Sequence, residues 1–383
     1  MGISINKERL AATFTTLCEI ESPSRREGEI SLWLQNACKD LGADFIYEDN
    51  SAIKTGSESG NLIIRFNGNQ PHVKGLFFAC HMDTVEPAQG VQVVRNGDIF
   101  TSKGETILGG DDKSGIAAII ELIQLLKENN LNHPLIEVVF TTCEEIGLFG
   151  AKYLESDQLT SSYGYALDAS GINHVIVGAP AANKVEIVVS GQAAHAGLCP
   201  EEGINALSVA VTALSTIKVG RLDGESSRNF GCIEGGAATN IVPETITLKG
   251  EVRSHSEEKL QYYTDEIEKS FQEAVDSWRP SPETKNKRPH FAITITADYP
   301  ALAIAADAPV LQRLCKGAET VGKEIKHIVA GGGSDANIFC GKGLQTAIIA
   351  TGMSKVHTVD EQLDLGDLIS LTELLVGIVT APA

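Results

Sequence analysis

The stretch LIEVVFTTCEEIG (residues 135–147) begins with the apolar run Leu135–Phe140 and closes with two adjacent glutamates, Glu144 and Glu145. A short apolar run of this kind is typical of a strand that is buried on both faces of a sheet. Successive side chains of an extended segment point to opposite sides, so the two carboxylates would have different surroundings. Because most carboxylates at a strand end are simply hydrated, a role for this pair requires support from the rest of the chain.

Similar apolar runs occur before and after this stretch. Leu76–Cys80 precedes it, Tyr165–Leu167 follows it, and Ala347–Ala350 repeats the pattern near the C-terminus. Between the first two runs, apolar residues recur at helical spacing across residues 114–130. Continuous apolar runs separated by helices predict an α/β fold with a largely parallel sheet covered by helices on both faces.

The pattern changes near residue 180, where strands with alternating polarity appear. The strand-like segments are Val185–Ser190, Asn229–Ile233, Thr245–Arg253 and Phe291–Thr296, and the helical segments are Ile204–Ile217 and Ser256–Trp278. Their order is β-α-β-β-α-β, which is typical of a small α+β domain. We therefore expect an α/β domain formed by residues 1–179 and 301–383, with an α+β domain inserted at residues 180–300.

Composition and charge exclude several classes of partner. A net charge of −19 over 383 residues argues against binding to nucleic acid or to anionic membrane surfaces. No segment reaches the ~20 apolar residues that a membrane span needs, and MGISINKERL lacks the apolar core of a signal peptide. Eight cysteines without a CxxC pair suggest reduced thiols. We expect a cytoplasmic protein without nucleic-acid or membrane partners.

Histidines and carboxylates follow the apolar runs of the larger domain, and two further aspartates lie at the entry to the helical segment 114–130. These residues are His81, Asp83, Asp111, Asp112, Glu144, Glu145, Asp168 and His357. In an open α/β sheet, ligands bind beyond the carboxyl ends of the strands. Five separate segments therefore deliver histidine or carboxylate side chains to one edge of the predicted sheet.

Two histidines with at least three carboxylates suit divalent ions such as Zn²⁺, Co²⁺ or Mn²⁺. The number of carboxylates exceeds the need of one ion and suggests two ions that share a bridging carboxylate and activate a water molecule. A further carboxylate would take the proton of that water and pass it to a leaving amine. One of the adjacent glutamates, Glu144 or Glu145, would then be the base and the other a ligand; their spacing does not decide which.

The motifs around these residues resemble those of the M20 metallopeptidases, and within them the peptidase T-like branch. The resemblance rests on HMD (81–83), GGDDKSG (109–115), TCEEIG (142–147), ALDAS (166–170) and KVH (355–357). Further motifs in the same order are ESPSRREGEI (21–30), AAHAG (193–197), ATNIVP (238–243) and GGGSDAN (331–337). The resemblance extends from about residue 10 to residue 375 and includes the inserted domain, which it identifies as a lid.

The resemblance implies a division of the ligands between two metal ions, most simply Zn²⁺. His81 and Asp168 would hold one ion, and Glu145 and His357 the other. Asp111, the first residue of the DD pair, would bridge them.

The resemblance also implies roles for residues that do not bind metal. Glu144 would be the general base, and Asp83 would orient His81 from behind. In the lid, His195 would steady the oxyanion. Asn240 and Arg253 would meet the carbonyl and the carboxylate of the substrate.

The function that follows is hydrolysis of short peptides by a two-metal exopeptidase, with removal of the N-terminal residue of tripeptides favoured. Ser334, in the glycine-rich loop 331–337, would contact the substrate. Alternatives with the same metal centre are an N-acyl amino acid amidohydrolase and a carboxypeptidase. A non-catalytic metal-binding or regulatory protein is the alternative from another class. A homodimer formed through the lid is a further expectation from the resemblance.

Overall fold

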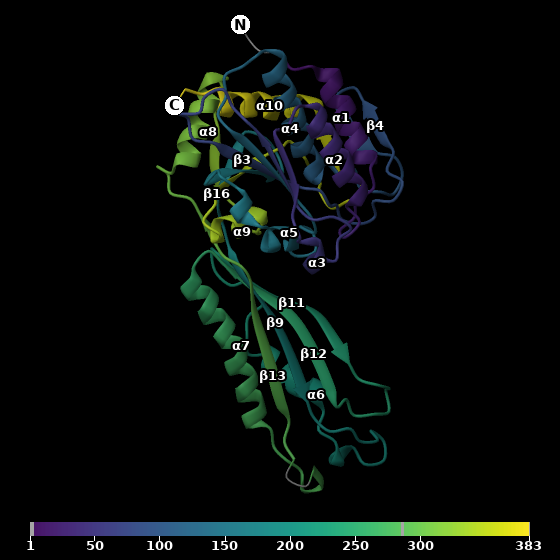
Figure 1. The fold of residues 1–383 in the computed structure, drawn as a ribbon. Coiled ribbons are helices and arrows are strands. Elements are labelled where there is room, and N and C mark those ends of the chain that lie inside the picture. Colours follow the sequence, from purple (N-terminus) through teal and green to yellow (C-terminus); the bar gives the residue numbers. More distant parts are fainter. Residues whose placement is uncertain (1–3, 285–286, 383) are drawn as a thin grey trace. The chain divides into compact units, whose positions relative to one another are not determined.

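The computed structural model describes residues 4–284 and 287–382 (Figure 1). Contacts between residues divide the chain into two compact units. Unit 1 comprises Met1–Gly178, Ala303–Ala330 and Ser334–Ala383, and unit 2 comprises Ala179–Leu302 and Gly331–Gly333. The chain thus leaves unit 1 after Gly178 and returns to it at Ala303. The glycines at 331–333 associate with unit 2, which the sequence pattern did not predict.

Unit 1 is built around one sheet with the strand order β1-β2-β6-β3-β7-β16-β8-β14, and β15 pairs with β8. These strands are β1 (Phe45–Glu48), β2 (Leu62–Phe66), β3 (Leu76–His81), β6 (Ile136–Thr141), β7 (Tyr163–Ala169), β8 (His174–Ala179), β14 (Leu302–Ala303), β15 (Lys326–Val329) and β16 (Gln345–Ala350). Neighbours among β6, β3, β7 and β16 are parallel, whereas β1, β2 and the β8–β16 pair are antiparallel. The prediction of a largely parallel sheet is confirmed.

Helices cover both faces of this sheet. The helices of unit 1 are α1 (Lys7–Glu19), α2 (Gly28–Asp40), α3 (Ala52–Thr55), α4 (Gly110–Glu128), α5 (Phe149–Tyr153), η1 (Ser156–Gln158), α8 (Pro309–Thr320), α9 (Asp335–Gly341) and α10 (Leu365–Thr380). The adjacent residues Phe77 and Phe78 of β3 point to opposite faces. Phe77 contacts Phe339 of α9, and Phe78 contacts Tyr165, whose hydroxyl donates to the Val310 carbonyl of α8.

A second, smaller sheet in unit 1 has the order β17-β5-β4. It consists of β4 (Val93–Asn96), β5 (Ile99–Ser102) and β17 (Gln362–Asp364), paired antiparallel. β4 and β5 are joined by a tight hairpin turn at Gly97 and Asp98, where Gly97 adopts a φ of 65°. This sheet ties the segment after residue 361 to the segment before α4.

Unit 2 contains one antiparallel sheet with the order β10-β11-β12-β9-β13. Its elements are β9 (Ala181–Ser190), η2 (Pro200–Glu202), α6 (Ala206–Leu214), β10 (Gly220–Arg221), β11 (Ser226–Gly235), β12 (Thr245–Ser254), α7 (Glu257–Ser277), η3 (Pro282–Thr284) and β13 (His290–Tyr299). The first and last of the long strands, β9 and β13, are neighbours, with Ala182 opposite Tyr299.

The core of unit 2 lies between one face of this sheet and the helices α6 and α7. Alternate residues of β9, such as Val185 and Ile187, are buried, whereas Lys184 and Glu186 between them are exposed. From α7, Ile267 and Phe271 are fully buried in the same core. Every second side chain of β9 therefore points to the face of the sheet that the helices cover.

No helix in the described part of the chain combines the length and the apolar character needed to cross a membrane.

Truncation of the fully buried Phe271 tests the core of unit 2. We expect Phe271→Ala to lower the free energy of unfolding by about 3–5 kcal/mol, because it removes a buried ring and leaves a cavity. The amide hydrogens of β9 and β12 should exchange faster in this variant than in the wild type. Tyr262→Ala, on the exposed side of the same helix, is the control and should leave exchange near wild type. Equal exchange in the two variants would contradict this core assignment.

Candidate metal centre

Unit 1 carries all five residues that were expected to bind metal. His81 is the last residue of β3, and Asp168 lies near the end of the parallel neighbour β7. Asp111 lies at the start of α4, and Glu145 follows β6 in the segment before α5. His357 lies between β16 and β17. Parallel strands that end at the same edge explain why residues distant in the sequence meet here.

Asp111 lies at the middle of the cluster. Its Oδ1 is 3.1 Å from Nε2 of His81, and its Oδ2 is 3.2 Å from Nε2 of His357. Each histidine also faces a second carboxylate: His81 Nε2 is 4.0 Å from Asp168 Oδ1, and His357 Nε2 is 3.1 Å from Glu145 Oε1. The two oxygens of Asp111 therefore face two different pairs, each made of one histidine and one carboxylate.

The tautomer of His81 is fixed by the chain itself. Its Nδ1 lies 2.8 Å from the backbone oxygen of Asp83, which can only accept a hydrogen bond. Nδ1 therefore carries the hydrogen, and Nε2 of the neutral ring would present a lone pair to the cluster. This is the orientation that a metal-binding imidazole needs.

The side chain of Asp83 holds the backbone of both adjacent glutamates. Its Oδ1 accepts from the amide of Glu144 at 2.9 Å, and its Oδ2 accepts from the amide of Glu145 at 3.2 Å. Ser24 donates its hydroxyl to the same Oδ2 at 2.6 Å. Asp83 therefore lies beside His81, as expected, but its hydrogen bond to the ring uses the backbone oxygen, while its carboxylate shapes the segment of the two glutamates.

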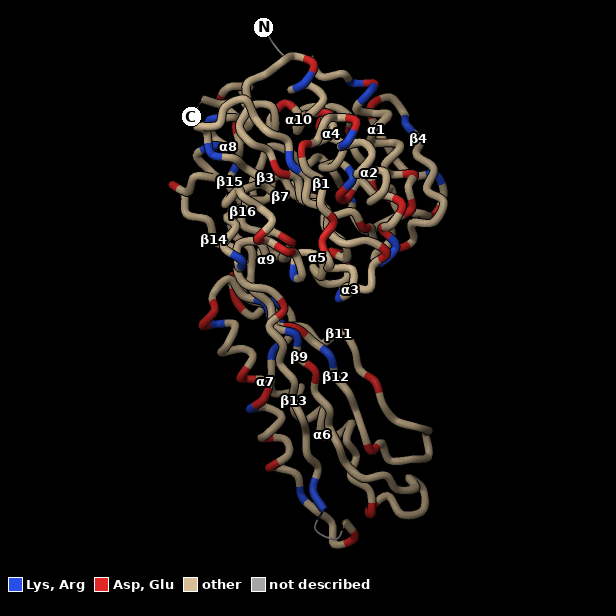
Figure 2. Tube along the Cα trace, viewed as in Figure 1, with Lys and Arg blue, Asp and Glu red and all other residues tan. Residues whose placement is uncertain are grey.

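Burial dominates the electrostatics of the cluster. It raises the pKa of Glu144 and of Asp168 well above the ordinary carboxyl range, and neighbouring carboxylates add to the effect. Burial also acts to raise the pKa of Asp111, but hydrogen bonds with His357 and His81 lower it overall. Figure 2 shows acidic segments of the trace near α5 and α9.

The donor atoms fit a divalent cation. One donor each from His81, Asp111 and Glu145 lies within 4.8 Å of the others, which is close enough for a shared ion. Imidazole nitrogen and carboxylate oxygen are the ligands that Zn²⁺ and related ions take in proteins. A cation would also offset the burial and the neighbouring negative charge that raise the pKa values of Glu144 and Asp168.

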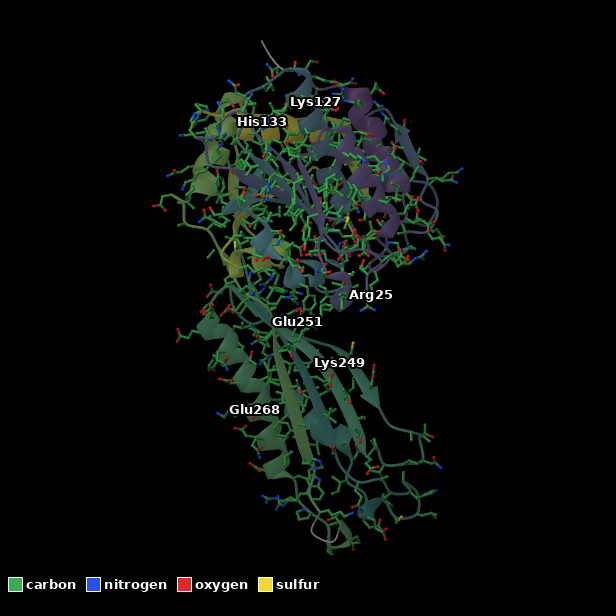
Figure 3. All side chains as sticks on the ribbon, in the orientation of Figure 1. Arg25, Lys127, His133, Lys249, Glu251 and Glu268 are labelled. Atoms are coloured by element: carbon green, nitrogen blue, oxygen red, sulfur yellow. The ribbon has the colours of Figure 1, made fainter. Side chains whose placement is uncertain are left out.

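The residues expected to contact substrate from the lid lie in unit 2. His195 is exposed, and its Nδ1 accepts from the Gly197 amide at 3.2 Å. Asn240 is also exposed and lies on a neighbouring segment, because its carbonyl accepts from the Ala196 amide at 2.9 Å. Arg253 lies at the other end of β12 and forms an ion pair with Glu251, labelled in Figure 3, at 2.9 Å.

Ser334 has a structural task in the first turn of α9. Its hydroxyl accepts from the Ala336 amide at 3.3 Å, and its own amide donates to Asn337 Oδ1 at 3.1 Å. The bond to Asn337 Oδ1, together with the Asn337 amide that donates to the Ser334 side chain, forms a capping box, which stabilises the start of a helix. The side chain was expected to contact substrate; here it is buried and its oxygen is used by the helix.

Sequence reasoning missed two buried carboxylates. Asp335 accepts from the Thr141 hydroxyl at 2.5 Å, and burial raises the pKa of Asp335 to about 6. Glu361 accepts hydrogen bonds from backbone amides at the start of α4. Asp335 follows Ser334 in the quoted motif GGGSDAN, so a signal was present. Glu361 follows Asp360 in a polar segment, where nothing in the sequence separates the two acids.

A pH titration of metal-free protein tests the ion pairs of His357. Hydrogen bonds to Asp111 and Glu145 raise the pKa of His357 from 6.5 to about 10. A histidine whose pKa is higher in the folded than in the unfolded state stabilises the fold at any pH below its unfolded-state pKa. This stabilisation is lost as the pH rises through its folded-state pKa. We expect chelator-treated protein to lose stability between about pH 6.5 and about pH 10, and His357→Gln to lose less, as measured by denaturant unfolding. Parallel losses in both proteins would contradict the pairing.

Comparison with known proteins identifies the family of this chain. The model of peptidase family M20/M25/M40 matches residues 77–381. The uncharacterised protein YqjE of Bacillus subtilis is 38% identical over 99% of this chain and 100% of its own length.

Two solved structures are similar over nearly the whole chain. The aminopeptidase PepT of Bacillus cereus is 35% identical, with a TM-score of 0.89 and 99% of each chain covered. A tripeptidase of Staphylococcus aureus is 33% identical, with a TM-score of 0.90 and again 99% of each chain covered. The resemblance found in the sequence motifs is confirmed: the chain belongs to peptidase family M20/M25/M40, in its peptidase T-like branch, and is a metallo-exopeptidase.

Proposed function

We propose that this protein removes the N-terminal residue of short peptides, tripeptides foremost, with two divalent metal ions. The observation that carries the proposal is the position of Asp111, whose two oxygens face two different histidine–carboxylate pairs. The similarity to an aminopeptidase and to a tripeptidase over 99% of the chain supports the choice of bond and of substrate length.

The ligands divide between two positions around Asp111. His81 and Asp168 would hold one ion, His357 and Glu145 the other, and Asp111 would bridge them. Zn²⁺ suits this set of imidazole and carboxylate donors, and Co²⁺ or Mn²⁺ would also be accepted. When bound, such ions supply an acidified water molecule and polarise the scissile carbonyl group.

Glu144 is the general base of the proposal. Burial raises its pKa well above the ordinary carboxyl value, so its carboxylate is a stronger base than an exposed one. The Asp83 carboxylate holds the Glu144 amide at 2.9 Å and thereby limits the positions open to the side chain. Glu144 would accept the proton of the attacking water and pass it to the leaving amine.

Unit 2 is proposed as the lid that supplies contacts to the substrate. Exposed His195 would stabilise the developing oxyanion, and Asn240, on the neighbouring segment, would contact a peptide carbonyl. Arg253 would bind the substrate carboxylate through its planar fork, in place of Glu251, its partner in this structure. Ser334 would contribute through its position at the start of α9 rather than through a free hydroxyl.

A homodimer formed through unit 2 is part of the proposal. Leu198, Leu207 and Val211 are exposed large apolar side chains, with 79%, 39% and 54% of their surface accessible. Leu207 and Val211 lie four residues apart on α6, and exposed apolar side chains on one face of a helix are typical of an association surface. We further propose a cytoplasmic location, which the free state of the cysteines in the described residues supports.

A digest of mixed short peptides tests the substrate class. We expect loss of N-terminal residues from unblocked tripeptides, prevented by a chelator and restored by Zn²⁺, Co²⁺ or Mn²⁺, as followed by mass spectrometry. Matched N-acetylated and C-amidated tripeptides serve as controls. Cleavage of the N-acylated substrates alone would instead assign the protein as an acylase or carboxypeptidase. No cleavage with any of the metals would favour a non-catalytic role.

Replacement of Glu144 separates the base from the ligands. We expect Glu144→Gln to lower kcat for a tripeptide by about 10²–10⁴-fold, the contribution of a general base, with metal content near wild type. Glu145→Gln is the matched control at the adjacent position and should lose metal. Metal content by atomic emission and kcat are the two measurements. Loss of both ions in Glu144→Gln would mean that Glu144 is itself a ligand.

A further inference from the structure

His357 lies in a hairpin that the backbone closes at its base. The Ser354 amide donates to the Gln362 carbonyl at 3.0 Å, and the Gln362 amide donates to the Ser354 carbonyl at 3.1 Å. Gln362 opens β17, which pairs with β5 of the small sheet. Within this hairpin, Glu361 is anchored by its own amide, which donates to the Thr358 carbonyl at 3.1 Å.

The carboxylate of Glu361 accepts three backbone hydrogen bonds from the segment that leads into α4. Its Oε2 accepts from the amides of Leu108 at 2.9 Å and of Gly109 at 2.8 Å. Its Oε1 accepts from the amide of Asp111 at 3.0 Å. Glu361 is only 2% exposed, so its carboxylate is shielded from water. The three amides supply the hydrogen bonds that water would otherwise donate.

The segment before α4 fits closely around this carboxylate. A Cβ atom added at Gly110 would lie 3.1 Å from Oε1 of Glu361 and 3.8 Å from Cζ of Phe14. Gly109 has a φ of 78°, which a residue with a side chain rarely adopts. The backbone on both sides of Gly110 is thus shaped to approach Glu361 closely.

We propose that Glu361 is a positioning residue, which fixes the backbone of Asp111 to the hairpin that carries His357. This inference rests on the proposed metal centre. The hairpin holds Asp111 at two points: Nε2 of His357 is 3.2 Å from its Oδ2, and Oε1 of Glu361 accepts from its amide. The Asp111 carboxylate, which would bridge the proposed ions, and His357, which would bind one of them, are thereby held together by contacts within the chain. Such groups behind the ligands are worth about 10–100-fold in metal affinity.

Metal binding without substrate tests this role. Co²⁺ is titrated into chelator-stripped protein in competition with a chromophoric chelator, and the visible spectrum of bound Co²⁺ is recorded. Glu361→Gln keeps the size of the side chain but loses its charge and one acceptor oxygen, and Glu361→Ala removes all three bonds. We expect both variants to bind Co²⁺ about 10–100-fold more weakly with an altered spectrum, and Gln to be the milder change.

Glu137 offers a matched control in the same unit. Glu137 is fully buried and accepts from the amides of Ser161 at 2.7 Å and Thr160 at 3.1 Å. It lies near the start of β6, whereas the cluster of proposed ligands lies beyond the end of that strand. Glu137→Gln should lower the unfolding temperature and leave Co²⁺ affinity unchanged.

Folded Glu361→Gln with the affinity and spectrum of wild type would overturn the positioning role. A wild-type protein that binds no Co²⁺ would overturn the proposed metal centre and the positioning role with it. Equal losses of affinity in the Glu361 and Glu137 variants would show a general loss of stability and also overturn it.

Discussion

Crowding of buried and half-buried carboxylates is the constraint on which the architecture of unit 1 depends. Asp111, Glu144, Glu145 and Asp168 come from three separate segments and meet at one edge of the sheet. Taking such groups out of water is costly unless cations or N–H donors compensate them. His81 and His357 face the carboxylates of Asp111, Asp168 and Glu145. Around the cluster, backbone amides donate to the neighbouring carboxylates Asp83 and Glu361, and these hydrogen bonds hold the segments that carry the cluster.

The sequence allowed the general form of this arrangement to be predicted. Apolar runs such as Leu76–Cys80 and Leu135–Phe140 are typical of buried strands, and parallel strands place their following residues at one edge. Strand order was not accessible, because pairing between distant strands depends on complete packing. The antiparallel edge formed by β1 and β2 therefore had no signal in the local pattern.

The supporting residues were harder to predict than the proposed ligands. Asp83 was placed beside His81 by its spacing, but which of its oxygens meets the ring depends on backbone dihedrals that spacing does not encode. Ser334 precedes a helix that was not predicted, so its capping task was missed. Arg253 can pair with Glu251 because residues two apart on a strand point to the same face of the sheet. This local rule predicts the ion pair but does not predict whether Arg253 binds a substrate.

The insertion of unit 2 has a consequence for how the protein can change. Its first and last long strands are neighbours, with Ala182 opposite Tyr299, and in unit 1 the Ile304 amide donates to the Val177 carbonyl. The exit and re-entry points of the chain are therefore held about 5 Å apart, the spacing of paired strands. Because the ends of the folded insertion lie side by side, unit 1 loses only about as much chain entropy on closing over it as on closing a short loop. Evolution can therefore enlarge, trim or exchange the inserted unit while the connectivity of the sheet that carries the proposed metal centre stays the same.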